Sequence, residues 1–241
     1  MRWAWSNDWH EFFGERPYPY DLSLVEMRDG WERECRMVRT VVGPPPGMLI
    51  DLGCGYGRHM AGLCEAGYRV VGTDISVECV RRSTERPGSH LAVCAANECL
   101  PFPDKVFDGA YSVYSSIGYA GTCTLRILAE ACRVTRQGGW LVIDVSRDPA
   151  RSLRWGWERV PHGVAAWTKR TGKRLVHQRN FVASRRVMGQ FGFTMERHTA
   201  VSLQRRAQWA GWADCQFYGD HALSPLEAGS RRLVMVACRP S

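Results

Sequence analysis

The fold is decided by residues 48–60, which read MLIDLGCGYGRHM. Three apolar residues lead into Asp51, and Gly53, Gly55 and Gly57 then alternate with other residues before a helix-compatible run begins. This succession predicts a buried strand, a tight turn and the start of a helix. Glycine permits a positive φ and lets the backbone approach a ligand closely, because it has no Cβ to clash. The turn is therefore a candidate ligand site.

A second acid follows on the next apolar run. Residues 68–73 predict a strand that ends at Asp74, whose carboxylate is placed to accept hydrogen bonds from two ribose hydroxyls. A dinucleotide fingerprint needs its third glycine three residues after the second, where this chain has Arg58. Asp51, two residues before the first glycine, would repel a pyrophosphate and attract a methionine ammonium. The predicted ligand is therefore a cationic nucleoside.

A third pattern lies in residues 97–120, which read NECLPFPDKVFDGAYSVYSSIGYA. The glycine turn, Asp74 and the L-P-F-x-D-x-x-F-D pattern in this stretch resemble the class I S-adenosylmethionine-dependent methyltransferases. The resemblance runs over residues 21–147 and resumes over 218–237. The phrase FYGDHALSPLEAGSRRLVMVA near the end of the chain is similar to the ending of many uncharacterised small-molecule methyltransferases from bacteria.

The resemblance implies an α/β fold with a doubly wound, Rossmann-like sheet of seven strands, of which the last is antiparallel. A length of 241 residues is consistent with one domain. We expect an N-terminal aromatic arm and lid helix (1–43), a cofactor-binding core (44–147), a substrate cap with a small inserted β-hairpin (148–198), and a closing helix and hairpin (199–241). Within these, we expect helices at 21–42, 59–66, 77–86, 124–135 and 199–209, with Gly138 and Gly139 ending the fourth. We expect strands at 48–50, 68–73, 91–95, 107–114, 140–145, 213–218 and 233–238, and the cap hairpin at 164–167 and 174–182.

The cofactor implied by the resemblance is S-adenosylmethionine. Ile75 is placed against a face of the adenine, although a core isoleucine would look the same. Relatives often carry an Asp four residues before Leu100 to bind the adenine amino group, and this chain has Ala96 there. Either Asn97 supplies the acceptor or backbone groups do so alone. The expected cofactor contacts are Asp51, Gly53, Cys54, Gly55, Gly57, Asp74, Ile75, Asn97 and Ser112.

Methyl transfer from a sulfonium is an in-line displacement, so the protein mainly has to align acceptor, methyl carbon and sulfur. A hydroxyl or ammonium acceptor must also lose a proton to a general base or to water. His177, in the predicted cap, is the first candidate base, with His162, His10 and Glu26 as alternatives. Tyr114 and Tyr119 follow the fourth strand, where they either orient an acceptor or pack in the core. The expected substrate contacts are Tyr18, Tyr20, Ser115, Ser116, Arg147 and Trp167.

The composition of the chain bears on three further questions: metal binding, location and the charge of a partner. Ten cysteines without a C-x-x-C pair, and histidines without H-x-x-x-H spacing, predict no metal site. No export signal and no apolar run long enough to span a bilayer are present, so we expect a cytoplasmic protein. The formal charge is +8, and the basic excess lies in residues 145–241. That excess is either a platform for an acidic partner such as RNA or a dispersed, solvated surface.

Three functions remain open from the sequence. The first is methylation of a small molecule, at nitrogen, oxygen or an electron-rich aromatic carbon, in bacterial secondary-metabolite biosynthesis. The aromatic residues of the arm and the cap favour a closed pocket for such an acceptor. The second is an RNA or protein methyltransferase that uses the basic half, although no N/D-P-P-Y/F signature is present. The third is a protein that binds the cofactor without methylating. The oligomeric state is open, with a homodimer as one alternative.

Overall fold

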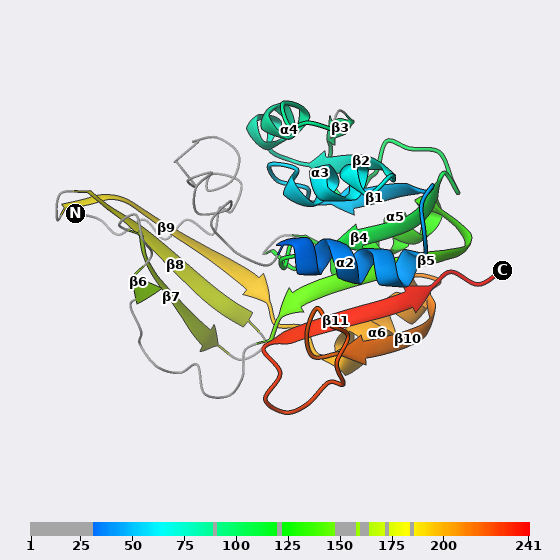
Figure 1. Ribbon diagram of the computed structural model, residues 1–241. Helices are drawn as coiled ribbons and strands as arrows, with labels where there is room; N and C mark the ends of the chain where they lie inside the picture. The colour runs from blue at the N-terminus through cyan, green and yellow to red at the C-terminus, as the bar shows by residue number, and fades with distance from the viewer. Residues whose placement is uncertain are drawn as a thin grey trace.

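The computed structural model describes residues 31–88, 91–119, 122–147, 158–159, 164–171, 174–183 and 186–241, and gives side chains outside 158–193 (Figure 1). The expected aromatic arm and the first part of the expected lid helix fall outside these residues. The described helix of that segment is α2, Trp31–Val42. It buries Cys35, Met37 and Val38, which share one face at helical spacing.

The main sheet has seven strands in the order β10-β11-β5-β4-β1-β2-β3. Their bounds are Met48–Leu52 (β1), Arg69–Asp74 (β2), Ala92–Cys94 (β3), Phe107–Ser112 (β4), Thr135–Ser146 (β5), Ala213–Tyr218 (β10) and Arg232–Cys238 (β11). Strands β1 to β5 are parallel, whereas β11 runs antiparallel to both β5 and β10. The expected seven-stranded, Rossmann-like sheet with an antiparallel last strand is confirmed.

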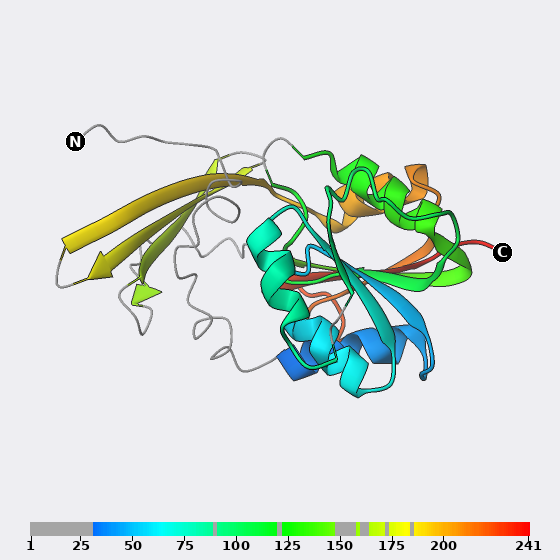
Figure 2. The ribbon, with the colours of Figure 1, turned by 90° about the horizontal axis from the view of Figure 1, so that it is seen from above.

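Helices cover both faces of this sheet (Figure 2). One face carries α2, α3 (Arg58–Glu65) and α4 (Val77–Thr84), and the other carries α5 (Thr124–Val134) and α6 (Ala200–Trp209). Thr199 starts α6 with a capping box, because its hydroxyl accepts from the Ser202 amide and the Ser202 hydroxyl accepts from the Thr199 amide. The chain alternates strands and helices, which is why the sheet has helices on both sides.

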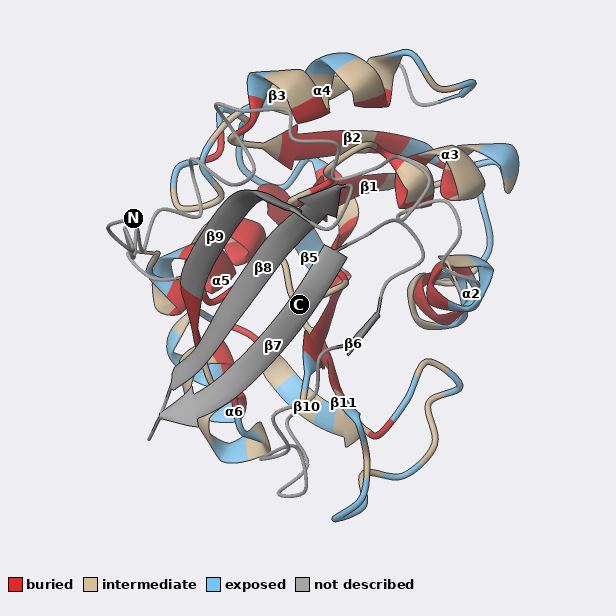
Figure 3. Ribbon diagram, turned by 90° about the vertical axis from the view of Figure 1, so that its left-hand side faces the viewer, coloured by how far each residue is buried: buried red, intermediate tan, exposed pale blue. Residues whose placement is uncertain are grey.

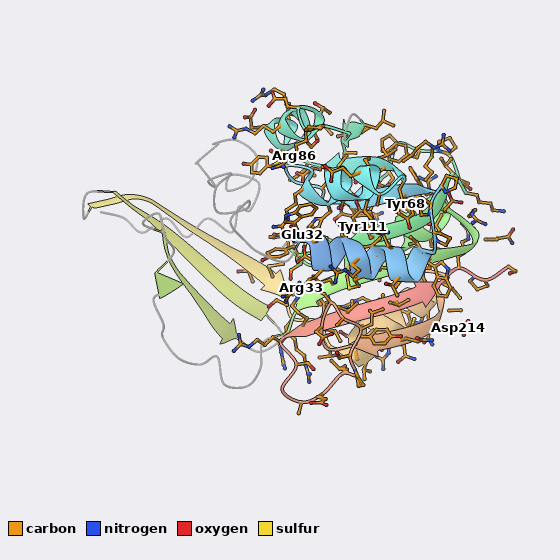
Figure 4. All side chains as sticks on the ribbon, viewed as in Figure 1. Glu32, Arg33, Tyr68, Arg86, Tyr111 and Asp214 are labelled. Carbon is orange, nitrogen blue, oxygen red and sulfur yellow. The ribbon has the colours of Figure 1, made fainter. Side chains whose placement is uncertain are left out.

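The core consists of two apolar layers, one on each face of the sheet (Figure 3). Side chains of β1 alternate between them: Leu49 packs under α2 and α3, while Ile50 and Leu52 pack under α5. Tyr111 of β4, labelled in Figure 4, is fully buried in the layer that α2 covers. In doubly wound folds ligands bind outside the carboxyl ends of the strands, so that edge is where a site is expected.

Strand β5 begins earlier than expected. Gly138 and Gly139 do not end a helix; they lie within β5, which follows α5 directly at Thr135. The reason is pairing with the end of the chain: Gly138 N–H donates to the Arg239 carbonyl, and Arg239 N–H donates to the Gly139 carbonyl. The register against β4 is irregular at this point, as expected where glycines interrupt a strand.

A second sheet stands in the place of the expected hairpin. It has four antiparallel strands in the order β6-β7-β8-β9, with bounds Glu158–Arg159, Val164–Thr171, Arg174–Ala183 and Arg186–Glu196. Strands β7 and β8 form the pair expected in the cap, and β9 is an addition to it. Figure 1 shows this sheet extending from the edge of the main sheet where β5 ends. We did not expect β9, because Gly189 and Gly192 weaken its strand pattern.

The second sheet is fastened at its base to the tip of β4. The Glu196 amide donates to the Gly118 carbonyl at 2.6 Å, and Tyr119 forms an isolated bridge with Met195. Where the chain leaves β5, the Ser146 amide donates to Ser115 Oγ at 2.6 Å. Both ends of the inserted segment are therefore hydrogen-bonded to the same loop, the one that follows β4.

Candidate functional site

The glycine turn between β1 and α3 has the geometry of a ligand cradle. Gly53, Gly55 and Gly57 have φ values of 79°, 52° and 75°, in the left-handed region that favours glycine. The amides of Gly53 and Cys54 donate to the Thr73 carbonyl at 2.8 and 2.9 Å, which ties the turn to β2. A Cβ on Gly55 would meet no atom within 4 Å, so this side of the turn is open.

Helix α4 supports the same turn from the other side. A Cβ on Gly57 would lie 2.8 Å from the Cβ of Ser83, so only glycine allows α4 to pack this closely. Arg86, labelled in Figure 4, follows α4, and its Nε donates to the Tyr56 carbonyl at 2.7 Å. These contacts hold the turn in place before any ligand binds.

Asp74 lies at the tip of β2 with its carboxylate directed to the turn. Oδ2 accepts from the Gly55 amide at 3.0 Å, and Oδ1 accepts from the Ser76 amide at 2.9 Å. Burial raises the pKa of Asp74, and these backbone hydrogen bonds oppose the rise. Each carboxylate oxygen has a second acceptor site, so the group can also accept two ribose hydroxyls.

Asp51 lies beneath the turn and is 1% exposed. Its Oδ2 atom is buried and accepts no hydrogen bond of ordinary geometry within the described residues, although the Tyr111 hydroxyl interacts with this carboxylate. Burial raises the pKa of Asp51 to about 8; the hydrogen bond from Tyr111 opposes this rise, and the negative charge of Asp74 adds to it. A buried acidic group under an open glycine turn, with only the Tyr111 hydroxyl interacting with it, suits a cationic group, and Asp74 suits a ribose. The residues present therefore fit S-adenosylmethionine.

The remaining expected cofactor contacts have structural partners of their own. Asn97 accepts from the Thr73 hydroxyl at 2.8 Å, which places its amide at the tips of β1 and β2. Ser112 is fully buried, and its hydroxyl donates to the Leu52 carbonyl at 3.0 Å. Cys54 is buried, whereas Ile75 is partly exposed directly after Asp74. Ser112 is thus bonded to the end of β1 and Cys54 to the end of β2, and their contact with the cofactor stays a prediction.

The loop after β4 is strained where it faces the turn. Tyr114 and Ser115 have φ values of 67° and 61°, although neither is glycine. Asp144 of β5 holds them: its Oδ2 accepts from the Tyr114 amide at 3.1 Å, and its carbonyl accepts from the Ser115 amide at 2.9 Å. Ser116 reaches the turn itself, donating to the Gly53 carbonyl at 3.2 Å. Such strain is concentrated at functional sites, where surrounding contacts enforce it.

Sequence reasoning missed a network of buried charges at this edge. Asp144 is fully buried and accepts from both Nε and Nη2 of Arg232, with Nε at 2.7 Å. The His221 Nε2 atom lies 3.2 Å from Asp144 Oδ2, and Nδ1 lies 3.9 Å from Glu34 Oε1. Burial alone would raise the pKa of Asp144, but His221 and Arg232 overcome it and lower the pKa to about 2.

Glu34 joins helix α2 to this network. It is 3% exposed, bonds to His59, and lies 3.6 Å from Nη2 of Arg58. Burial lowers the pKa of His59, and the bond to Glu34 offsets part of that. The network draws on five separate segments, so no local spacing reveals it. The one available signal was Glu34 itself, an acid on the apolar face that Met37 and Val38 occupy.

Three of these residues also form a group with metal-ligand atoms. One atom each from Glu34, Asp144 and His221 lie within 4.8 Å of one another. The guanidinium of Arg232 already pairs with Asp144, and that of Arg58 lies beside Glu34. These cations supply the charge that a metal would otherwise supply. That the protein needs no metal remains a prediction.

Of the other expected residues, Arg147, Trp167 and His177 lie in described segments of the chain. Arg147 donates from its backbone to the Arg231 carbonyl and from Nη1 to the Glu227 carbonyl, so it braces the connection before β11. His177 lies in β8 opposite Thr168 of β7, and Trp167 precedes Thr168 in that strand. The side chains of these two strands are not described. Tyr18, Tyr20, His10, Glu26 and His162 lie outside the described residues. Among the residues described, no helix has both the length and the apolar character to cross a membrane.

Comparison with known proteins agrees with this geometry. A family described as "Methyltransferase domain" matches residues 50–143. The chain is 30% identical over 185 residues to a malonyl-[acyl-carrier protein] O-methyltransferase of Methylococcus capsulatus, covering 72% of this chain and 65% of that protein. It is 34% identical over 150 residues to a demethylmenaquinone methyltransferase of Thermobifida fusca, covering 57% and 62%. The matches thus span less than two thirds of either curated relative.

Solved structures share the fold over nearly the whole chain. The sugar N-methyltransferase KedS8 from Streptoalloteichus matches with a TM-score of 0.77 and 21% identity, covering 100% of this chain and 99% of that one. The CcbJ methyltransferase from Streptomyces caelestis matches with a TM-score of 0.74 and 15% identity, covering 88% and 90%. The methyltransferase domain, the sheet order and a site that fits the cofactor agree. Residues 50–143 match the methyltransferase-domain family, and the chain as a whole has the fold of the class I S-adenosylmethionine-dependent methyltransferases.

Proposed function

We propose that this protein is an S-adenosylmethionine-dependent methyltransferase with a small-molecule acceptor, and that nitrogen is the first acceptor atom to test. The observation that carries the proposal is the second sheet, inserted between β5 and α6 and fastened to the loop after β4. It stands at the carboxyl edge, where ligands bind in this class of fold. Such a wall favours an enclosed pocket, which suits a small acceptor better than a polymer.

The comparisons support this reading without deciding the acceptor. The curated relatives are described as acting in O-methylation of an acyl-carrier-protein substrate and in methylation of demethylmenaquinone. One solved structure that covers all of this chain is described as a sugar N-methyltransferase. The test therefore includes acceptors that are methylated at oxygen or aromatic carbon as well as at nitrogen. A role in secondary-metabolite biosynthesis and a cytoplasmic location remain predictions from the sequence.

In the mechanism we propose, the protein accelerates methyl transfer by holding the acceptor in line with the methyl carbon and the sulfur. The cofactor supplies a methyl group on a positively charged sulfur, which is already a good leaving group. The turn from Gly53 to Gly57 and the carboxylate of Asp74 fix the nucleoside, while the loop at Tyr114 to Ser116 borders the acceptor side. Holding two reactants in line removes several kcal/mol of the barrier, of the order of 7–11 kcal/mol in well-oriented systems. No side chain has to form a covalent intermediate.

The test is product formation with defined acceptors. Purified protein is incubated with S-adenosylmethionine and a panel of amino sugars, alkyl amines, phenols and quinols, and methylated products are detected by mass spectrometry. We expect turnover with at least one low-molecular-weight acceptor and none with bulk RNA or a protein mixture. Asp74→Ala serves as the matched inactive control. Turnover with a macromolecule alone would refute the small-molecule proposal.

The second candidate is an RNA methyltransferase, which the basic excess of residues 145–241 favours. Binding through phosphate contacts loses affinity steeply as salt rises, because counterions are released on association. A salt titration of RNA binding therefore separates the two candidates. A steep loss of affinity together with methylated RNA would favour the second, and weak binding without product would favour the first.

A further inference from the structure

His198 is a buried histidine that no hydrogen bond supports. It lies between β9 and α6 and is 5% exposed. Neither Nδ1 nor Nε2 has a hydrogen-bond partner among the residues that the structure describes. A neutral imidazole in such a place has already lost its hydrogen bonds to water, and an imidazolium would in addition bury a charge that nothing compensates. The surroundings therefore favour the neutral ring strongly over the protonated one.

The ring lies at the point where the second sheet is anchored to the main sheet. A Cβ added to Gly118 would overlap His198 Nε2, so the imidazole packs directly against the loop after β4. The Gly118 carbonyl also accepts from the Glu196 amide, and Tyr119 forms its isolated bridge with Met195 next to it. His198 thus contacts the same residue of the loop that holds the end of β9.

The charged groups that act on His198 are already bonded to each other. Glu196 of β9 pairs with Arg206 of α6, and its Oε2 accepts from the Thr124 hydroxyl of α5 at 3.3 Å. Thr124 and Gly118, through which α5 and the loop after β4 meet this cluster, carry no charge. Burial is the largest effect on His198 and lowers its pKa to about 4, while Glu196 opposes this change and Arg206 adds to it.

We propose that His198 is a pH-sensitive latch that holds the second sheet on the loop after β4. The neutral ring fills the space beside Gly118 and keeps the base of the sheet docked. Protonation makes the docked form unfavourable, so the base of the sheet separates from the loop and the ring reaches water. Acid would in this way loosen the wall at the acceptor side. The inference concerns how the insert is held, so it does not depend on the identity of the acceptor.

The size of the effect follows from the two environments of the ring. The pKa of His198 is about 4 in the docked form, and its ordinary value, expected when the ring reaches water, is 6.5. The docked form is therefore fully favoured above pH 6.5 and loses this advantage as pH falls towards 4. The ratio of the released form to the docked form should rise about 30-fold between pH 8 and pH 5.

Hydrogen exchange of single amides measures this ratio in the full-length protein. The Glu196 amide reports docking, because its hydrogen bond to the Gly118 carbonyl breaks when the base separates. The Cys54 amide, which donates to the Thr73 carbonyl at 2.9 Å, is the reference in the glycine turn. Exchange is followed by NMR between pH 5 and pH 8 and corrected for the intrinsic rate of each amide.

The proteins compared are wild type, His198→Gln and His221→Gln. His221 is the matched control, because it lies in the connection between β10 and β11, outside this cluster. We expect opening at Glu196 to rise about 30-fold towards pH 5 in wild type and in His221→Gln, and to change little in His198→Gln. Opening at Cys54 should change little in all three proteins.

An equal rise at Glu196 and Cys54 would show that acid loosens the whole fold, and it would overturn the proposal. Opening at Glu196 that is independent of pH in wild type, or an undiminished rise in His198→Gln, would overturn it as well. The imidazole signals of His198 in wild type give a test that needs no variant. Titration near pH 4 supports the latch, and titration at the ordinary value of 6.5 contradicts it.

Discussion

We expect Asp51 to lower the free energy of unfolding of the protein without bound cofactor. Replacing Asp51 should show how large this effect is. Its carboxyl group is 1% exposed, and burial raises its pKa to about 8 from the ordinary value of 3.8. Between these two pH values the folded protein holds a proton that the unfolded chain has lost. The free energy of unfolding therefore falls as pH rises, by roughly 1.4 kcal/mol per pH unit from this group. At pH 7 the accumulated loss is about 4 kcal/mol.

Asp51→Asn keeps the shape of the side chain and removes this titration. We expect the variant to equal wild type in stability near pH 4 and to exceed it increasingly up to about pH 8, by as much as 4 kcal/mol at pH 7. Urea unfolding at a series of pH values measures the difference. Asp104→Asn controls for removal of a surface charge, since the Asp104 side chain is 67% exposed.

The same variant should bind S-adenosylhomocysteine more weakly, because the acidic oxygen that attracts the ammonium is gone. Stability and cofactor binding should thus move in opposite directions. A stability difference that stays flat between pH 4 and pH 8, or a variant that is less stable throughout, would show that Asp51 is ionised and paired in the folded protein. The reasoning from its burial would then be refuted.

Three further outcomes are expected. Asp74→Ala should weaken S-adenosylhomocysteine binding by about 100-fold or more in calorimetry, since a charged acceptor for two hydroxyls is lost; unchanged affinity would remove Asp74 from the site. Gly118→Ala should destabilise the protein by about 2–4 kcal/mol, because φ is 91° and a Cβ would fall on His198 Nε2. Gly229→Ala, where a Cβ meets nothing within 4 Å, is its control in urea unfolding, and equal effects would contradict the clash. Asp144→Asn should cost about 2 kcal/mol at neutral pH. Because the pKa of Asp144 is lowered to about 2, its contribution is present above pH 3.8 and lost as pH falls towards 2, so the gap between the two unfolding curves should close there.

The sequence predicted the core of the fold because its signals there are local. The glycines at 53, 55 and 57 lie between an apolar run and a helical run, and each element is defined by its own neighbours in the chain. The expected strand at 68–73 and the expected helix at 77–86 differ from β2 and α4 by one or two residues at their ends. Helix and strand ends depend on caps and pairing partners, which the pattern does not specify.

The features that the sequence did not predict depend on contacts between residues that are far apart in the chain. Gly138 and Gly139 were expected to stop a helix, but Arg239 pairs with both and extends β5 through them. The charge network was missed for the same reason, since Asp144 and Arg232 meet across neighbouring strands with no motif between them. Their pairing follows from the position of β11 beside β5, which only the folded sheet reveals.

The hydrogen bonds that anchor the second sheet mark the boundary between the cofactor-binding core and an inserted segment. The chain leaves the core at Ser146 and re-enters it at Glu196, and both points bond to the same short loop, at Ser115 and Gly118. We expect that what lies between these anchor points can be lengthened, shortened or grafted from a relative without moving the cofactor turn. On the proposed function, we predict that a change of acceptor needs changes only in this insert, while the nucleoside site stays as it is.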